Sequence, residues 1–198
     1  MNQNASQIWN VPNTLSMLRL VLSVVVFTCI AMGDFMAAFV LFLITAFTDK
    51  VDGWWARKFN QVTQLGRMLD PFADKILICG AFIMLAAAPK MQEVPWGIQP
   101  WMAVLVMGRE MLVTAIRGFV EQHGGNFSAN WSGKIKMVFQ CVAAAAGILF
   151  LHFAVAGNDV PAWLYWTLVA SVWVTIISTI QSGMEYIFKA VSMLKSLT

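Results

Sequence analysis

Long apolar runs separated by short polar breaks dominate the chain. A helix that crosses the hydrocarbon core of a bilayer needs about 20 mostly apolar residues, or fewer where its polar ends are shielded. Gly33-Asp34 separates the first two runs, and several Pro and Gly residues between 89 and 100 mark a loop after the third. The pattern predicts an all-α integral membrane protein with six transmembrane helices. These helices are expected at residues 15–32, 35–57, 70–88, 101–120, 133–156 and 162–188.

The first twelve residues follow a different pattern. Ile8, Trp9 and Val11 stand among polar neighbours, which is typical of a segment that lies along the membrane surface. We therefore expect an N-terminal interfacial helix before the first span. No positive residue precedes Arg19, and no small-residue cleavage site follows the first apolar run, so this run is expected to stay as a permanent span.

Composition supports a membrane setting. Of the 198 residues, 59% are hydrophobic and 12% are charged, whereas about 25% are charged in an ordinary soluble domain. The length favours one domain, covering residues 1–198. With six spans, twelve of the 13 Lys and Arg residues fall on the side that holds both termini, and Lys90 alone falls on the other. The positive-inside rule then predicts a multi-pass cell (inner) membrane protein with both termini in the cytoplasm.

Four aspartates gather in one segment of this apolar chain. Asp49 and Asp52 are three residues apart on the second predicted helix, and Asp70 and Asp74 are four apart at the start of the third. Each pair therefore shares a helix face. Because the connection between these helices is short, we expect them to be antiparallel neighbours whose acidic faces meet. Intramembrane carboxylates are costly and are usually kept for a function.

A positive charge must balance this cluster. Four ionised carboxylates about 5 Å apart, at an effective dielectric near 20, repel by roughly 3 kcal/mol per pair, or about 20 kcal/mol in total. An ion-pair network with nearby Lys and Arg residues is one solution. However, Lys50 and Lys75 each follow an aspartate directly and so point about 100° away from it. Only Arg57 is well placed to face the cleft.

Divalent metal ions are the other solution. Sites built only from carboxylate oxygens suit Mg²⁺, Mn²⁺ or Ca²⁺, and two bridged metals can clamp a phosphoryl group during its transfer. Gly53, Ala56 and Gly66 would let a ligand approach the helix backbone closely. Helix packing explains these small residues equally well.

The acidic segment resembles the signature of the CDP-alcohol phosphotransferase family. The pattern is Asp-x-x-Asp-Gly-x-x-Ala-Arg, then eight residues, then Gly-x-x-x-Asp-x-x-x-Asp, and all eight specified positions match between residues 49 and 74. "VPNTLSMLRL", "GREMLVTAIR" and "SGKIKMVFQ" are similar to blocks of the bacterial phosphatidylglycerophosphate synthases. This subfamily more often has threonine at Ser16 and Met137, and leucine at Ile116.

The resemblance implies a metal-dependent membrane enzyme, usually a homodimer, that transfers a substituted phosphate from a CDP-linked donor to an alcohol. Asp49, Asp52, Asp70 and Asp74 would bind two Mg²⁺ or Mn²⁺ ions, with Asp74 also acting as the general base. The donor would be CDP-diacylglycerol, in contact with membrane lipids, and no nucleic-acid partner is expected. The residues implied at the nucleotide and its phosphates are Asn13, Ser16, Gly53, Ala56, Arg57, Thr63 and Gly66.

The resemblance also implies sn-glycerol 3-phosphate as the acceptor, a dianion that needs a cationic pocket. Arg109 and Arg117 are eight residues apart, about 80° on the helical circle, so they share a broad face. Lys134 and Lys136 begin the fifth helix on the same side of the membrane. These four residues would hold the acceptor phosphate, since Arg offers forked hydrogen bonds. Contact with lipid headgroups is the alternative, especially for Lys136.

Two other functions are consistent with parts of the pattern. The same family includes enzymes with other acceptors, such as inositol phosphate or serine. Intramembrane carboxylates also occur in divalent-cation transporters, but many transporters have two related halves. Here the acidic signature occurs once, with no counterpart in the last three apolar runs. We therefore expect phosphatidyl transfer rather than transport.

Overall fold

The computed structural model describes residues 11–58, 64–122 and 131–197, with side chains for 14–48, 72–118, 136–188 and 191. All regular structure in these residues is α-helical, as the apolar pattern predicts. Six helices are long, and a one-turn helix lies within the predicted loop after the third. The helices are α1 (Val11–Met32), α2 (Phe35–Lys58), α3 (Gln64–Ala87), α4 (Pro89–Gln92), α5 (Pro100–Gln122), α6 (Trp131–Val155) and α7 (Ala162–Leu197).

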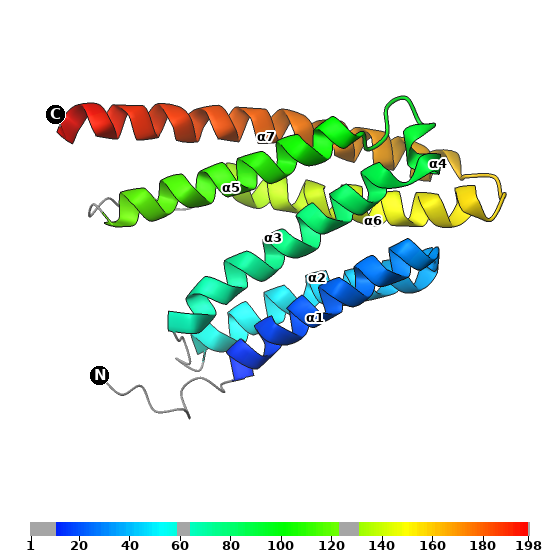
Figure 1. Ribbon diagram of the computed structural model, residues 1–198, viewed down its shortest axis with the longest axis horizontal. Helices are drawn as coiled ribbons and strands as arrows, with labels where there is room; N and C mark the ends of the chain where they lie inside the picture. The colour runs from blue at the N-terminus through cyan, green and yellow to red at the C-terminus, as the bar shows by residue number, and fades with distance from the viewer. Residues whose placement is uncertain (1–10, 59–63, 123–130, 198) are drawn as a thin grey trace.

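The long helices form an elongated bundle with two distinct ends (Figure 1). One end, here called the terminal end, holds the start of α1, the end of α7, and the ends of α2 and α5 with the starts of α3 and α6. The other, here called the α4 end, holds α4, the turn between α1 and α2, and the connection from α6 to α7. The chain thus brings to one end the helix ends that were predicted to share one side of the membrane.

The turn between α1 and α2 shows how the sequence sets these boundaries. Gly33 has a positive φ of 81°, a conformation that glycine adopts without steric cost. Its N–H bonds to the carbonyl of Ile30 at 3.1 Å, and the N–H of Asp34 bonds to that of Cys29 at 2.9 Å. This pair of bonds ends a helix in a Schellman motif. The Asp34 carboxylate then accepts the N–H of Ala37 at 3.2 Å and caps α2.

Helix packing differs from one prediction. α2 and α3 were expected to be antiparallel neighbours, but in the described residues they touch each other little, and α1 packs against both of them. The two helices meet near their shared terminal end and diverge towards the other (Figure 1). A short connection fixes only the ends that it joins, so it does not force contact along the whole length. On the other side of the bundle, α7 packs against α6 and α5.

Three helix boundaries also differ from the prediction. The third helix was expected from residue 70, but α3 begins at Gln64 and continues through Gly66 and Pro71, residues that usually disfavour a helix interior. The last helix was expected to end at residue 188, but α7 continues to Leu197. Val11, assigned to the interfacial segment, begins α1. Residues 1–10, which make up most of that segment, lie outside the described residues.

The apolar character of the long helices is uneven. Within the described residues, three stretches are long and apolar enough to cross a membrane: Thr14–Met32, Lys136–Val155 and Ala162–Phe188. The apolar part of α2, Phe35–Thr48, is shorter. The charged residues of α2, α3 and α5 lower their hydropathy, and they are the residues to which the sequence assigns chemistry. The expectation of six spans therefore stays a prediction for these helices.

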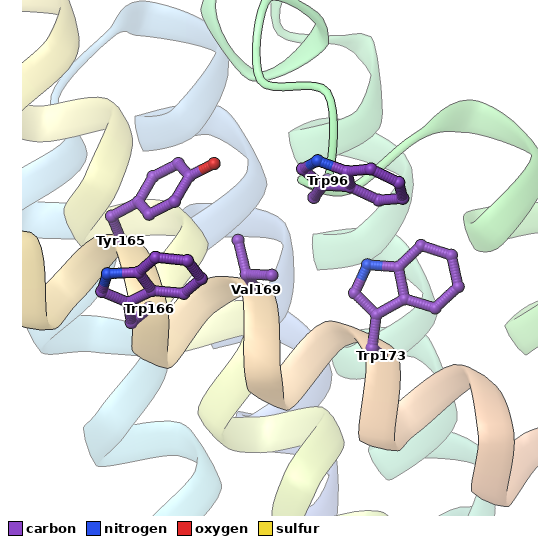
Figure 2. Close-up of a pocket in the computed structure, with 5 residues that line it drawn as sticks. All are labelled: Trp96, Tyr165, Trp166, Val169 and Trp173. Atoms are coloured by element: carbon purple, nitrogen blue, oxygen red, sulfur yellow. The ribbon is translucent and has the colours of Figure 1, made fainter.

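Aromatic side chains line a pocket at the α4 end. Trp96, from the segment before α5, faces Tyr165, Trp166 and Trp173 of α7 across this pocket (Figure 2). The rings of Trp96 and Trp173 are 5.9 Å apart between centroids and tilted by 57°. Trp and Tyr are enriched where a membrane protein meets the bilayer surface. This position suits a belt at the membrane boundary, far from the charged residues of the terminal end.

Close contact between α1 and α3 depends on Gly80. A Cβ atom at this position would lie 2.1 Å from Cζ of Phe27. We expect Gly80→Ala to lower the free energy of unfolding by about 1–3 kcal/mol, because overpacking forces side chains or backbone to shift. Thermal unfolding of the purified protein in detergent measures this change, and adding Phe27→Leu should recover part of it.

Gly118→Ala is the matched control. Gly118 lies within α5, and a Cβ atom there would meet nothing within 4 Å. This change should leave stability unchanged or raise it by up to about 1 kcal/mol, since alanine favours a helix. Equal losses for both alanine variants would contradict the packing explanation.

Candidate active site

The first part of the site is built around Asp74 on α3. Nη1 of Arg19, on α1, donates to Oδ1 of Asp74 at 3.1 Å. The Arg19 side chain is only 1% exposed and that of Asp74 is 24% exposed, so this ion pair lies largely inside the bundle. Ser16 and Ser23 lie on the same face of α1 as Arg19 and are buried. The ion pair fixes the orientation of the carboxylate between α1 and α3.

The remaining acidic and nucleotide-site predictions lie outside the described side chains. Asp49 and Asp52 belong to α2 and Asp70 belongs to α3, and these helices meet at the terminal end (Figure 1). In the part of the chain with described side chains, no three His, Cys, Asp or Glu residues group as metal ligands. The metal and nucleotide sites therefore stay predictions. This applies to the side chains of Asn13, Asp49, Asp52, Gly53, Ala56, Arg57, Thr63, Gly66 and Asp70.

Lys75 turns away from Asp74, as the helical spacing predicts. Its Nζ contacts Oγ1 of Thr114 on α5, whereas Asp74 faces Arg19 on α1. The Thr114 hydroxyl donates to the main-chain carbonyl of Glu110 at 2.7 Å. Two consecutive residues of α3 thus face two different helices, so α3 lies between the carboxylate site and a second group of charged residues.

Glu110 of α5 is the centre of this second group. Its Oε1 accepts a hydrogen bond from Nη1 of Arg109 at 3.1 Å and another from Nζ of Lys136 on α6. The side chain of Lys136 is 1% exposed and that of Glu110 is 16% exposed. Charges this deeply buried require partners. Lys136 is therefore held inside the protein, which argues against contact of its side chain with lipid headgroups.

The two predicted arginines of α5 are brought together by α7. Nε of Arg109 donates to Oγ of Ser182 at 2.9 Å, and its guanidinium carbon lies 5.7 Å from the centroid of the Tyr186 ring. Nη2 of Arg117 donates to the hydroxyl of Tyr186 at 3.3 Å. Nε of Arg117 is buried without a hydrogen-bond partner among the described residues. Such a donor can bind a ligand.

Four of these side chains form a group with an excess of positive charge, here called the cationic cluster. Lys75, Arg109, Arg117 and Lys136 each carry one positive charge, and Glu110 is the one carboxylate that the described contacts place among them. This excess suits an anion with two charges, and arginine side chains match the geometry of phosphate oxygens. The structure thus brings three of the four predicted acceptor residues into one group, while the side chain of Lys134 lies outside the described residues.

Several residues of the site were not predicted from the sequence. Arg19 entered only as a positive charge on one side of the membrane, although its place within an otherwise uncharged span was a signal of function. The sequence assigned no role to Glu110. Ser182 and Tyr186 carried no signal, because a hydroxyl on an apolar helix is common. Their partners are 73 and 69 residues away in the chain.

A comparison with known proteins shows the family of the chain. The model of the CDP-alcohol phosphatidyltransferase family matches residues 9–181. The chain belongs to this family and is therefore a membrane-bound transferase of phospholipid biosynthesis.

Curated relatives carry a more specific description. The chain is 33% identical to the CDP-diacylglycerol–glycerol-3-phosphate 3-phosphatidyltransferase of Bacillus subtilis, over 95% of this chain and 98% of that protein. It is 30% identical to the enzyme of the same description from Rickettsia felis, over 91% of this chain and 94% of that protein. It is 32% identical to the Escherichia coli enzyme of that description, over 69% of this chain and 75% of that protein.

The buried pair of Glu110 and Lys136 gives a test of the site's construction. We expect Glu110→Gln to lower stability by about 3–5 kcal/mol, because it leaves Lys136 buried without its partner. Lys136→Met should cost less, because Glu110 keeps its contact with Arg109. The double variant should lose less than the sum of the two, by at least about 1 kcal/mol. Thermal unfolding in detergent, analysed as a double-mutant cycle, measures this coupling.

Lys90 and Glu93 supply the control pair. They form an ion pair of 3.0 Å at the α4 end, with side chains 49% and 63% exposed. Exposed pairs contribute about 1 kcal/mol or less, so Lys90→Met and Glu93→Gln should show little coupling. If the losses at Glu110 and Lys136 were simply additive, the buried pair would not be a structural unit.

Proposed function

We propose that this protein transfers the phosphatidyl group of CDP-diacylglycerol to sn-glycerol 3-phosphate, forming phosphatidylglycerophosphate and CMP. The observation that carries the proposal is the cationic cluster of Lys75, Arg109, Arg117 and Lys136. The cluster reaches α3 through Lys75, and the preceding residue, Asp74, matches the general base of the family. The relatives with this described activity align with nearly the whole chain.

The acceptor pocket follows from the charges of the cluster. The phosphate of sn-glycerol 3-phosphate is a dianion, and neutral acceptors such as serine or a simple polyol would leave the cationic excess unbalanced. Arg109 has five N–H donors and uses two nitrogens in the contacts with Ser182 and Glu110. Its remaining donors, Nε of Arg117 and Lys136 supply the phosphate contacts. Lys134, at the start of α6, is assigned to the same pocket.

The donor site is assigned to the acidic segment. The oxygen donors of Asp49, Asp52, Asp70 and Asp74 suit Mg²⁺ or Mn²⁺, and two such ions would offset negative charge on the diphosphate and on the departing CMP. Arg19 holds Asp74 in place beside this segment. The residues assigned to the nucleotide and its phosphates are Asn13, Ser16, Gly53, Ala56, Arg57, Thr63 and Gly66.

The transfer step is a single displacement at phosphorus. The acceptor hydroxyl oxygen attacks the phosphorus that carries diacylglycerol, and the bond from this phosphorus to the oxygen of CMP breaks. Asp74 takes the proton from the hydroxyl. Asp74 and Lys75 are consecutive residues of α3 and face different helices, so the proposed base and one cation of the cluster are attached to the same turn of one helix.

The membrane arrangement completes the proposal. The chain forms one domain with six transmembrane helices, and both termini and the active site face the cytoplasm. This side carries twelve of the 13 Lys and Arg residues, in agreement with the positive-inside rule. The enzyme acts as a homodimer, in keeping with the family pattern.

Acceptor choice gives the sharpest test of this function. Purified protein with labelled CDP-diacylglycerol and Mg²⁺ is offered sn-glycerol 3-phosphate, inositol phosphate, serine and choline in separate reactions. We expect CMP release and a phosphatidyl product with sn-glycerol 3-phosphate alone, because the acceptor pocket is built for a compact phosphate dianion. Consumption of serine alone would show that the acceptor assignment is wrong, and metal flux in proteoliposomes without CMP release would indicate transport.

Asp74→Asn tests the base and the metal site together. Asparagine keeps the size of the side chain but can neither accept the proton nor bring a negative charge to a metal. We expect at least a 100-fold loss of kcat, since general base catalysis contributes about 10²–10⁴-fold. Chelation of divalent ions should abolish activity of the unmodified enzyme, and added Mg²⁺ or Mn²⁺ should restore it. Full activity of Asp74→Asn with metal present would remove Asp74 from the base role.

A further inference from the structure

The side-chain positions of Arg109 and Arg117, the arginines of the proposed acceptor-phosphate pocket, are fixed by α7. None of the four residues of the cationic cluster belongs to this helix. Arg109 and Arg117 are separated by eight residues on α5, so their side chains leave the helix about 80° apart. A single phosphate can be held by both only if the two guanidinium groups converge. The groups that fix them come from α7, through Ser182 and Tyr186.

Tyr186 contacts both arginines at once. Its hydroxyl accepts a hydrogen bond from Nη2 of Arg117 at 3.3 Å, while its ring lies 5.7 Å from the guanidinium carbon of Arg109. A cation near an aromatic face gains about 0.5–2 kcal/mol. Ser182 adds the 2.9 Å bond from Nε of Arg109. Gly183, in the next position, lies beside the Arg109 stem, where a Cβ atom would make an ordinary contact of 3.7 Å with Cγ of Arg109.

The face of α7 that carries these residues is polar and buried. Thr175, Thr179, Ser182 and Tyr186 are 0%, 1%, 2% and 7% exposed. At intervals of four, three and four residues they lie on one side of the helix. Burying polar groups in an apolar bundle costs free energy unless they make hydrogen bonds. If this face served only to pack α7 against its neighbours, apolar residues would be favoured here. Its buried polar residues therefore indicate a role besides packing.

The family match stops just before these two residues. It covers residues 9–181, whereas the arginines that Ser182 and Tyr186 hold lie well within it. We propose that Ser182 and Tyr186 are positioning residues that set the geometry of the acceptor-phosphate pocket by fixing Arg109 and Arg117. This inference rests on the proposed function. It assigns part of the acceptor specificity to the C-terminal part of α7.

Steady-state kinetics of two variants, each lacking one hydroxyl group, test the inference. Tyr186→Phe removes the hydroxyl that binds Arg117 and keeps the ring beside Arg109, and Ser182→Ala removes the acceptor of Nε. Each should raise KM for sn-glycerol 3-phosphate about threefold to tenfold, the range expected for one hydrogen bond. KM for CDP-diacylglycerol and kcat should change less than twofold. Inhibition by inorganic phosphate, used as a probe of the pocket, should weaken in parallel.

The chain offers matched controls for both changes. Tyr165→Phe alters the other tyrosine of the chain, 21 residues earlier on α7 and so about 30 Å away along the helix, in the aromatic pocket of Figure 2. Ser178→Ala removes a hydroxyl that bonds the carbonyl of Thr175 within the same helix at 3.0 Å. Both controls should keep the wild-type KM for each substrate.

A double variant separates positioning from general stability. In an Arg117→Ala background, Tyr186→Phe should have no further effect on KM for sn-glycerol 3-phosphate, because the hydroxyl then has no guanidinium to position. Unchanged KM in both single variants, equal effects in the controls, or full additivity with Arg117→Ala would overturn the inference. Wild-type protein that releases no CMP with sn-glycerol 3-phosphate would instead refute the proposed function. If one variant does not fold, the other carries the test.

Discussion

An ion can be buried in an apolar bundle only beside a counter-ion, and this constraint organises the terminal end around Glu110. Its carboxylate accepts hydrogen bonds from Arg109 on its own helix and from Lys136 on α6. Removing one partner of such a pair costs about 3–5 kcal/mol, so α5 and α6 are held in one arrangement at this end. α3 joins the same group through Lys75 and Thr114, and α7 joins it through Arg109.

The same constraint connects the other half of the bundle. Arg19 is almost completely buried and meets Asp74 across the contact of α1 with α3. Because Asp74 and Lys75 are neighbours in the chain, a movement of α3 would disturb both groups together. One helix, α3, therefore fixes the position of both groups: the carboxylate that is proposed to take a proton and the cations that are proposed to hold the acceptor. Such rigidity is what in-line transfer between two bound substrates requires.

Local sequence pattern predicted the elements better than their contacts. Apolar runs and the Gly33-Asp34 break gave six long helices with most ends close to those observed, and helical spacing correctly turned Lys75 away from Asp74. Spacing on α5 also placed Arg109 and Arg117, which the family resemblance had pointed to, on one broad face. What the pattern lacked was the pairing of helices distant in the chain: Arg19 with Asp74, and Arg109 with Ser182, are 55 and 73 residues apart. Periodicity identifies a face but not its partner, so α2 and α3 were paired too closely.

The length of α7 has a consequence for how the enzyme responds to its surroundings. Its 36 residues span about 54 Å, well beyond a hydrocarbon core of about 30 Å. Aromatic rings of α7 line the pocket at the α4 end, and Tyr186 lies 21 residues, about 30 Å, beyond Tyr165. A thinner bilayer would make such a helix tilt. Tilting would displace the hydroxyl groups of Ser182 and Tyr186, which accept hydrogen bonds from the two arginines. Turnover measured in vesicles of graded acyl-chain length would then vary with bilayer thickness, so that the enzyme would sense a physical property of the membrane whose lipids it supplies.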